Sequence, residues 1–290
     1  MAPLESVPNF SEGRDRATID ALGAALERWV RVLDLHVDAD HNRCVFTVVG
    51  DEGELVDGLV AAVAVAVDRI KLAGHDGVHP RIGAADVVPI VPVVPEDLDR
   101  ARAVVPELGR RIGELGVPVF VYDPPARGPA FYRRGGLAEL ERRLNVGELV
   151  SDFGPRHVHP TAGAVICGAR RPLVAFNVNL RGTLTVAKEI AAVVREAGGG
   201  FSGVRALGLD LAGQGLVQVS MNIEDWQAAP PYLVVERIAA EAELRGAEVV
   251  GSELIGLLPA GVVAQGGADA LRIPGFDESR ILEARIAASS

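Results

Sequence analysis

Histidines are unevenly placed in this chain of 290 residues, and their placement limits where acid–base chemistry can occur. All 6 lie before Pro160, and two stand in the segment His75–Pro89, which reads HDGVHPRIGAADVVP. Its glycines and prolines precede an apolar run, so we expect a loop held by a strand, where catalytic groups concentrate. An imidazole such as that of His79 can accept and return a proton near neutral pH, because its unperturbed pKa is about 6.5. A solvated loop in which His79 makes only a turn contact is the alternative.

A second polar group, VDADHNR at Val37–Arg43, follows the alternating apolar residues of a predicted strand. Asp38 ends that strand, and a carboxylate there can orient an imidazole by accepting its ring N–H, which fixes the tautomer. An ordinary polar turn between two strands would give the same pattern, so the residues alone leave both interpretations open.

The segment FGPRHVHPTAG, Phe153–Gly163, is rich in residues that interrupt regular structure. Backbone N–H groups that no helix or sheet has used could bind an anion or the edge of a heterocycle there. Arg156 would add a positive charge to such a site. A plain linker between two lobes is the alternative.

The segment FNVNL, Phe176–Leu180, carries two side-chain amides, those of Asn177 and Asn179, two residues apart. On a strand this spacing places both side chains on one face, where they could contact a polar ligand. The alternative is that the two asparagines only cap strand ends and turns.

The composition is typical of a folded protein, with 49% hydrophobic and 23% charged residues. A net charge of −10 argues against non-specific nucleic-acid binding, which needs a broad basic surface. The two cysteines, Cys44 and Cys167, are expected to be buried thiols in a reducing compartment. The N-terminus lacks a signal-peptide pattern, and the longest aliphatic run, Leu59–Val67, is too short to span a bilayer. We therefore expect a cytoplasmic protein with no membrane partner.

The predicted elements alternate between helices and strands but include a direct hairpin, which favours a mixed α/β, or α+β, fold over a doubly wound sheet. The expected helices are Arg14–Arg28, Asp51–Leu72 and Pro231–Leu244, and the hairpin joins Val204–Leu211 to Leu216–Asn222. The prolines of Asp86–Val94 predict an edge or interrupted strand, and Asp123–Gly136 is predicted to be a loop. A boundary near Ala169 would give an N-terminal lobe, 1–169, and a C-terminal lobe, 170–290.

Seven segments together resemble one known family, and they stand in that family's order. They are VPNFSEGRD at Val7–Asp15, VDADHNR at Val37–Arg43, HPRIGAADVVP at His79–Pro89, VPVFVYD at Val117–Asp123, DFGP at Asp152–Pro155, GARRPLVAFNVNL at Gly168–Leu180 and VQVSMNIEDW at Val217–Trp226. From about residue 5 to about residue 260, the chain resembles the formiminotransferase domain of formiminotransferase-cyclodeaminase and its free-standing bacterial relatives.

The resemblance implies two lobes, each a mixed or antiparallel sheet with helices on its outer face, and a folate-binding groove between them. It implies that His79 is the catalytic histidine and that Asp38 is its partner carboxylate. It also implies that folate contacts the segment made of Gly154, Pro155, Arg156, His157, Val158, His159, Pro160, Thr161, Ala162 and Gly163. In that segment, Arg156, His157 and His159 depart from a more apolar family pattern.

The implied reaction moves the formimino group of N-formimino-L-glutamate to tetrahydrofolate, the co-substrate, and releases L-glutamate. One proton must leave the attacking amine and one must reach the departing nitrogen, which a single imidazole can accomplish without a metal. Arg43, Arg81 and Arg156 are candidates to pair with the carboxylates of glutamate or folate, although each could equally form a protein ion pair. A separate cyclodeaminase is expected downstream, because the chain resembles only the transferase domain. The sequence is compatible with a homodimer.

Three other classes of function stay open from the residues. The same scaffold could transfer a formyl group between glutamate and folate with the same acid–base group. A metal-dependent hydrolase could use His75 with His79, or His157 with His159. A ligand pair four residues apart needs a helix, however, and the glycine and proline of that loop disfavour one. The third class is a folate-binding protein without catalysis.

Overall fold

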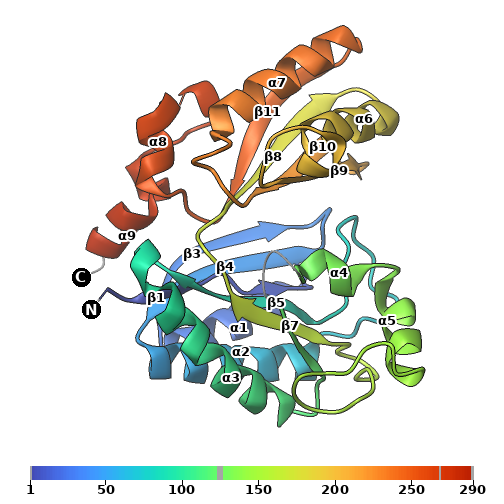
Figure 1. Cartoon of the computed structure of the whole chain (residues 1–290), viewed down its shortest axis with the longest axis vertical. Helices are drawn as coiled ribbons and strands as arrows, with labels where there is room; N and C mark the ends of the chain where they lie inside the picture. Colours follow the sequence, from blue (N-terminus) through green and yellow to red (C-terminus); the bar gives the residue numbers. More distant parts are fainter. Residues whose placement is uncertain (1, 123–126, 268, 289–290) are drawn as a thin grey trace. The chain divides into compact units, whose positions relative to one another are not determined.

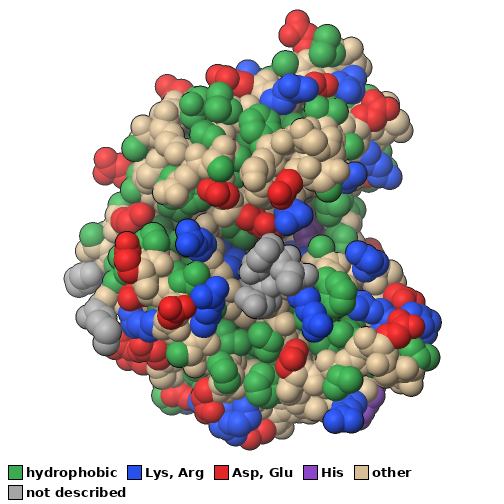
Figure 2. All heavy atoms as spheres, in the orientation of Figure 1, with side chains coloured by type: hydrophobic (Ala, Val, Ile, Leu, Met, Phe, Trp, Pro, Cys, Tyr) green, Lys and Arg blue, Asp and Glu red, His purple; other side chains and the backbone are tan. Residues whose placement is uncertain are grey.

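The computed structural model describes residues 2–122, 127–267 and 269–288. They form two compact units that divide between Arg171 and Pro172, and each unit has its own sheet, helices and apolar core (Figure 1). The predicted mixed α/β fold with two subdomains is therefore confirmed. Acidic and basic side chains are interspersed over the face drawn in Figure 2. Among the described residues, no helix is long and apolar enough to cross a membrane.

The first unit contains a seven-stranded mixed sheet. Its strands are β1 Leu4–Ser6, β2 Asn9–Phe10, β3 Arg31–Asp38, β4 Arg43–Gly50, β5 Ala85–Pro92, β6 Val119–Val121 and β7 Val165–Ala169. The strands β3, β4, β1, β2 and β5 pair antiparallel, whereas β7 lies parallel to β5 and to β6. Valine is the commonest residue of these strands, as expected because its β-branched side chain fits a pleated, buried surface.

Three long helices pack on one face of this sheet (Figure 1). They are α1 Arg16–Glu27, α2 Glu52–Arg69 and α3 Leu98–Gly113, the last preceded by the 3-10 turn η1 Pro95–Asp97. Helix α2 begins at a capping box in which Asp51 and Glu54 bond each other's backbone, as its predicted start requires. It ends at Arg69 rather than Leu72, because Ile70 takes an extended conformation. The buried side chains of α2 recur at helical spacing, which places one apolar face on the core.

The opposite face of the sheet is covered near β6 by two shorter helices, α4 Pro129–Arg133 and α5 Gly136–Asn145. The predicted loop over Asp123–Gly136 is therefore wrong for α4, while its residues 123–126 lie outside the described residues. Pro129 suits the first turn of a helix, where a missing N–H costs nothing. Tertiary packing stabilises the helix, since the buried ring of Tyr132 stacks on Phe120 with centroids 5.2 Å apart.

Strand β5 corrects a second expectation, because it lies inside the sheet rather than at its edge or as an interrupted strand. Proline removes a ladder donor and is normally excluded from central strands. Here Pro89 falls opposite the break between β1 and β2, where the neighbouring chain is Val7 and Pro8 and forms no ladder. Its carbonyl accepts a hydrogen bond of 2.6 Å from the hydroxyl of Ser6. The other proline, Pro92, is the last residue of the strand.

The second unit is built on an antiparallel sheet in the order β11-β8-β10-β9. Its strands are β8 Val174–Arg181, β9 Val204–Leu211, β10 Leu216–Ile223 and β11 Glu248–Ile255. The remaining elements are helices α6 Leu184–Val194, α7 Pro231–Leu244, α8 Ala260–Gly266 and α9 Leu282–Ala288, with 3-10 turns η2 Glu196–Gly198, η3 Asp269–Leu271 and η4 Glu278–Arg280. The predicted β9–β10 hairpin is confirmed, and Gly215 in its turn has a φ of 66°. Helices α6 and α7 pack on one face of the sheet around Phe176 and Val178.

Candidate active site

The predicted catalytic residues stand at two loops of the first unit. Asp38 ends β3 just before residues 39–42, which join β3 to β4, and His79 lies within residues 71–84, which precede β5. Asn42 ties the two loops together from a left-handed conformation, with φ of 45°, which asparagine tolerates better than most residues. Its Oδ1 accepts from the amide of Gly13 at 2.9 Å, and its Nδ2 donates to the carbonyl of Asp76 at 2.9 Å. A Cβ on Gly13 would lie 2.1 Å from the carbonyl oxygen of Asp38, so only glycine fits this crossing.

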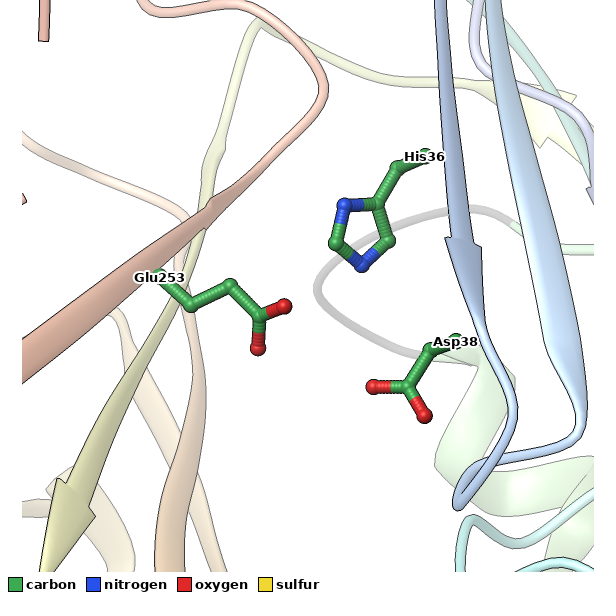
Figure 3. Close-up of side chains that lie close together, drawn as sticks. All are labelled: His36, Asp38 and Glu253. Atoms are coloured by element: carbon green, nitrogen blue, oxygen red, sulfur yellow. The ribbon is translucent and has the colours of Figure 1, made fainter. Parts of the chain in front are cut away.

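Asp38 pairs with His41, and not with His79 as the resemblance implied. Its two carboxylate oxygens accept from the backbone N–H of His41 at 2.8 Å and from Nδ1 of the same ring at 2.6 Å. The short turn between β3 and β4 explains this choice, because it brings residues three apart together while His79 lies on the other loop. Burial acts to raise the pKa of Asp38, but the hydrogen bonds from His41 outweigh it and hold that pKa below its ordinary value. Figure 3 shows Asp38 projecting from β3 on the same side as His36.

His79 lies near this pair, with its ring centroid 6.1 Å from that of His41. Its Nδ1 is 2.9 Å from Nη1 of Arg43, which can only donate, and 2.8 Å from the carbonyl oxygen of Pro80, which can only accept. The same nitrogen thus has a partner for each tautomer. A protonated Nδ1 bonds Pro80 and leaves Nε2 as a base, whereas an unprotonated Nδ1 accepts from Arg43.

The surroundings of His79 favour its neutral form. Burial lowers its pKa most, and the nearby charges of Arg43 and Arg133 lower it further, so the pKa falls well below the ordinary value of 6.5. A neutral imidazole at working pH can accept a proton from a substrate, which is the first requirement for a general base.

Arg43 extends from β4 into the interior, where it bonds three side chains. Its Nε and Nη2 donate to Oδ1 of Asn9 at 3.0 and 2.6 Å, and its Nη1 also donates to Asp86 at 3.2 Å. Burial lowers the pKa of Arg43 to about 10, which still leaves it protonated at neutral pH. Most of its donors are bound by protein groups, so Arg43 has little capacity left for a substrate carboxylate.

Asp86 is the fully buried counter-ion of this region. One oxygen accepts from the amide of Ile82 at 2.9 Å, and the other accepts from Arg43 and, at 2.5 Å, from Arg133. Burial acts to raise the pKa of Asp86, but the two guanidinium groups hold it below its ordinary value. The side chain therefore stays ionised and fixes both arginines.

Arg81, the second predicted carboxylate clamp, is occupied by the backbone. Its guanidinium donates to the carbonyl oxygens of His41, Asn42 and His79 at distances between 2.5 and 3.2 Å. Its Nη1 also lies 3.1 Å from the ring of His75, whose Nε2 is 2.7 Å from the carbonyl of Ser11. Arg81 thus fastens the two loops to each other, which leaves few of its donors for a substrate carboxylate.

The predicted folate segment, 154–163, is anchored at its C-terminal end by its own hydrogen bonds. His159 and Gly163 exchange backbone hydrogen bonds of 2.9 and 3.0 Å, and Nδ1 of His159 accepts from the amides of Thr161 and Ala162. These amides are therefore used within the segment, which corrects the expectation that they stand available to a ligand. Arg156 and His157 lie at the exposed N-terminal part.

Asn177 and Asn179 lie in the second unit, on the face of its sheet that points away from the buried core residues of β8. Gln218 and Glu253 share that face: Gln218 donates to Asn179 at 2.8 Å, and Asn177 donates to Glu253 of β11 at 3.3 Å. Among the described residues, Oε1 of Gln218 is buried without a hydrogen-bond partner. The predicted pair of amides is thus part of a polar network rather than a set of strand caps.

His75 and His79, one of the two histidine pairs that a metal-dependent hydrolase could use, lack the helical spacing of a ligand pair. Residues 75–79 are turn and loop rather than helix, and guanidinium groups stand beside both His75 and His79. A cation next to the donor atoms opposes the binding of a metal ion. The thiols of Cys44 and Cys167 are buried as predicted, and burial raises the pKa of each to about 12, so neither is a nucleophile at neutral pH.

The sequence did not identify Asn9, Asp86 and Arg133 of this site in the first unit. It also did not identify Gln218 and Glu253 of the polar network in the second unit. Asp86 could have been identified from the sequence, because a carboxylate at the start of an otherwise apolar strand needs a partner when it is buried. Arg133 could not have been identified in this way, because its helix was predicted to be a loop.

The chain was also compared with known proteins. A model of the formiminotransferase domain, N-terminal subdomain, matches residues 3–170, and a model of the formiminotransferase domain matches residues 175–271. A glutamate formimidoyltransferase of Streptococcus pyogenes serotype M1 is 38% identical over 97% of this chain and 97% of its own length. A glutamate formimidoyltransferase of Thermoplasma acidophilum is 37% identical over 99% of this chain and 98% of its own length. The formimidoyltransferase-cyclodeaminase of Gallus gallus is 38% identical over 89% of this chain, which spans 51% of that protein. The chain belongs to the formiminotransferase domain family.

Proposed function

We propose that the chain is a glutamate formimidoyltransferase, which transfers the formimino group of N-formimino-L-glutamate to tetrahydrofolate. The observation that carries this proposal is the similarity, over nearly the full length of both chains, to two proteins of that name. The neutral imidazole of His79, held among arginines, fits the acid–base chemistry and the anionic substrates of such a reaction. Tetrahydrofolate is the co-substrate, and the reaction belongs to folate-dependent histidine catabolism.

The proposed mechanism uses His79 twice. As the secondary amine of the pteridine attacks the amidine carbon, Nε2 of His79 takes the proton of that amine while Nδ1–H bonds the carbonyl of Pro80. The resulting imidazolium lies near Arg43 and Arg133, which oppose its charge. It therefore readily gives the proton to the departing nitrogen, and L-glutamate leaves. No covalent enzyme intermediate is needed.

The assay that tests this function offers tetrahydrofolate together with either formiminoglutamate or formylglutamate and measures glutamate release. Fast release from formiminoglutamate alone is the expected result. Release only from formylglutamate would assign the chain to formyl transfer, and no release from either donor would contradict the proposed activity.

We propose that Asp38 acts through His41, whose ring it orients towards the loop of His79. Asp38→Asn is expected to lower turnover by about tenfold or more, less than the loss of His79, because the amide cannot accept and stabilise the ring N–H in the same way. The fold should survive, since the amide oxygen can still accept from the backbone of His41. Steady-state kinetics with a thermal-unfolding control measure both effects.

A double-mutant cycle of Asp38→Asn with His41→Gln tests whether Asp38 acts through His41 or independently of it. If the carboxylate works through His41, the double variant loses no more activity than the more damaging single variant. Full activity in both Asp38→Asn and Asp38→Ala would reduce Asp38 to a turn residue.

We propose that folate contacts residues 154–163, with Arg156 binding an anionic part of it. Arg156→Ala is expected to raise the KM for tetrahydrofolate by about tenfold, since a charge-assisted hydrogen bond is lost, with less effect on kcat. Arg102→Ala, which removes the same charge from the exposed surface of α3, serves as the control and should change neither constant. Hydrogen exchange with and without folate gives the independent measurement. Unchanged protection of residues 154–163 on folate addition would move the folate site elsewhere.

A further inference from the structure

Three guanidinium groups gather around the loop that carries His79, and they differ in what they already bind. The three nitrogens of Arg81 donate to backbone carbonyls. Those of Arg43 donate to Asn9 and Asp86, and its Nη1 also lies 2.9 Å from the ring of His79. An arginine whose nitrogens are bound by protein acceptors holds the structure together and has little capacity left for a ligand.

Arg133 is different. Among the described residues, its one hydrogen bond runs from Nη2 to Oδ2 of Asp86, and its Nε is buried without an acceptor. Only 15% of its side chain is exposed. Buried donors without partners are uncommon in proteins, because the lost hydration is not repaid. A guanidinium with one N–H bound to Asp86 keeps the others for a planar acceptor such as a second carboxylate.

The charges of this group are not balanced. Arg43 and Arg133 share a single oxygen of Asp86, so two cations meet one carboxylate in a buried place. Both cations also lie close enough to His79 to lower its pKa. In a chain with a net charge of −10, this is a local excess of positive charge beside the proposed acid–base group, and it favours an anion there.

We propose that Arg133 binds the α-carboxylate of the amino-acid substrate and positions the nitrogen of that substrate at His79. This inference rests on the proposed function. In N-formimino-L-glutamate the α-carboxylate and the departing nitrogen are bonded to the same carbon. The group that binds the α-carboxylate must therefore lie close to the acid that protonates the departing nitrogen. The carboxylates of the folate tail are separated from the reacting amine by the aminobenzoyl group, so they do not suit a site next to His79.

The test compares wild type with Arg133→Gln, which removes the charge, and Arg133→Lys, which keeps it but removes the planar fork. In Arg133→Gln the KM for formiminoglutamate should rise by about tenfold or more, while the KM for tetrahydrofolate stays constant and kcat changes less. The control is Arg134→Gln, the same substitution at the adjacent exposed arginine, which should leave all three constants unchanged.

Product inhibition identifies which carboxylate is bound. L-Glutamate and 4-aminobutyrate differ only in the α-carboxylate, so wild type should be inhibited more strongly by L-glutamate. That preference should largely disappear in Arg133→Gln and be reduced in Arg133→Lys. The acid limb of kcat/KM should also move to higher pH in Arg133→Gln, because one of the cations that oppose protonation of His79 is gone, a change that a purely structural role would not produce.

An unchanged KM for formiminoglutamate together with an unchanged preference for L-glutamate would overturn the inference. If Arg133→Gln fails to fold, Arg133→Lys provides the test, because lysine can keep the ion pair with Asp86. A wild-type preference for L-glutamate over 4-aminobutyrate in Arg133→Lys would also overturn the inference. Failure of the proposed function looks different. In that case wild type shows no turnover, yet calorimetric binding of L-glutamate still exceeds that of 4-aminobutyrate in a manner that depends on Arg133.

Discussion

His79→Ala is expected to lower turnover by about a hundredfold or more, the usual effect of removing a general acid–base group. The fold should be retained, because His79 lies on a loop and is only partly buried. The affinity for tetrahydrofolate should change little, since the ring is proposed to act on protons rather than to hold the folate. Single-turnover and steady-state kinetics, with circular dichroism as a check on folding, measure these effects.

The control for this variant is Val78→Ala, on the same loop and exposed, which should keep wild-type turnover. The pH profile gives a second measurement. Because burial, Arg43 and Arg133 lower the pKa of His79 well below 6.5, the acid limb of kcat/KM should fall below pH 6.5 in the wild type. Near wild-type turnover in His79→Ala would remove this residue from the mechanism.

Asp86→Asn is expected to lower the free energy of unfolding by about 3–5 kcal/mol, the usual cost of removing one partner of a buried ion pair. The carboxylate is fully buried and balances Arg43 and Arg133, so the amide would leave two buried cations without an anion. Urea unfolding of the two proteins measures the difference.

The pH dependence of this stabilisation has a defined sign. The folded-state pKa of Asp86 is held below 3.8, so its contribution is fully present above pH 3.8 and is lost as the pH falls through the folded-state value. The difference between wild type and Asp86→Asn should therefore shrink in acid. Asp99→Asn, on the exposed surface of α3, is the matched control and should unfold as the wild type does. Equal stability of Asp86→Asn and wild type would contradict the assignment of a balancing role to Asp86.

Local sequence patterns predicted most elements because the interactions that define them are local. The capping box at Asp51, the bounds of α7 and the β9–β10 hairpin all depend on residues within a few positions of one another. The prolines of β5 gave a wrong prediction, that of an edge or interrupted strand, because the place of a strand in a sheet is not a local property. The place of β5 inside the sheet depends on the break between β1 and β2, about 80 residues away in the chain, which no local pattern records.

The sequence by itself determined the family, the mixed α/β class and the loops in which polar residues concentrate, because motif order and hydrophobic periodicity are properties of the chain. Only the tertiary structure decided which of these polar residues meet. It pairs Asp38 with His41, brings Arg43 to His79, and joins Arg133 to Asp86. These last two contacts connect residues 36 and 47 positions apart. Hydrogen bonds and charges act over a few ångströms in space, so their partners are fixed when the strands and helices pack and not by spacing along the chain.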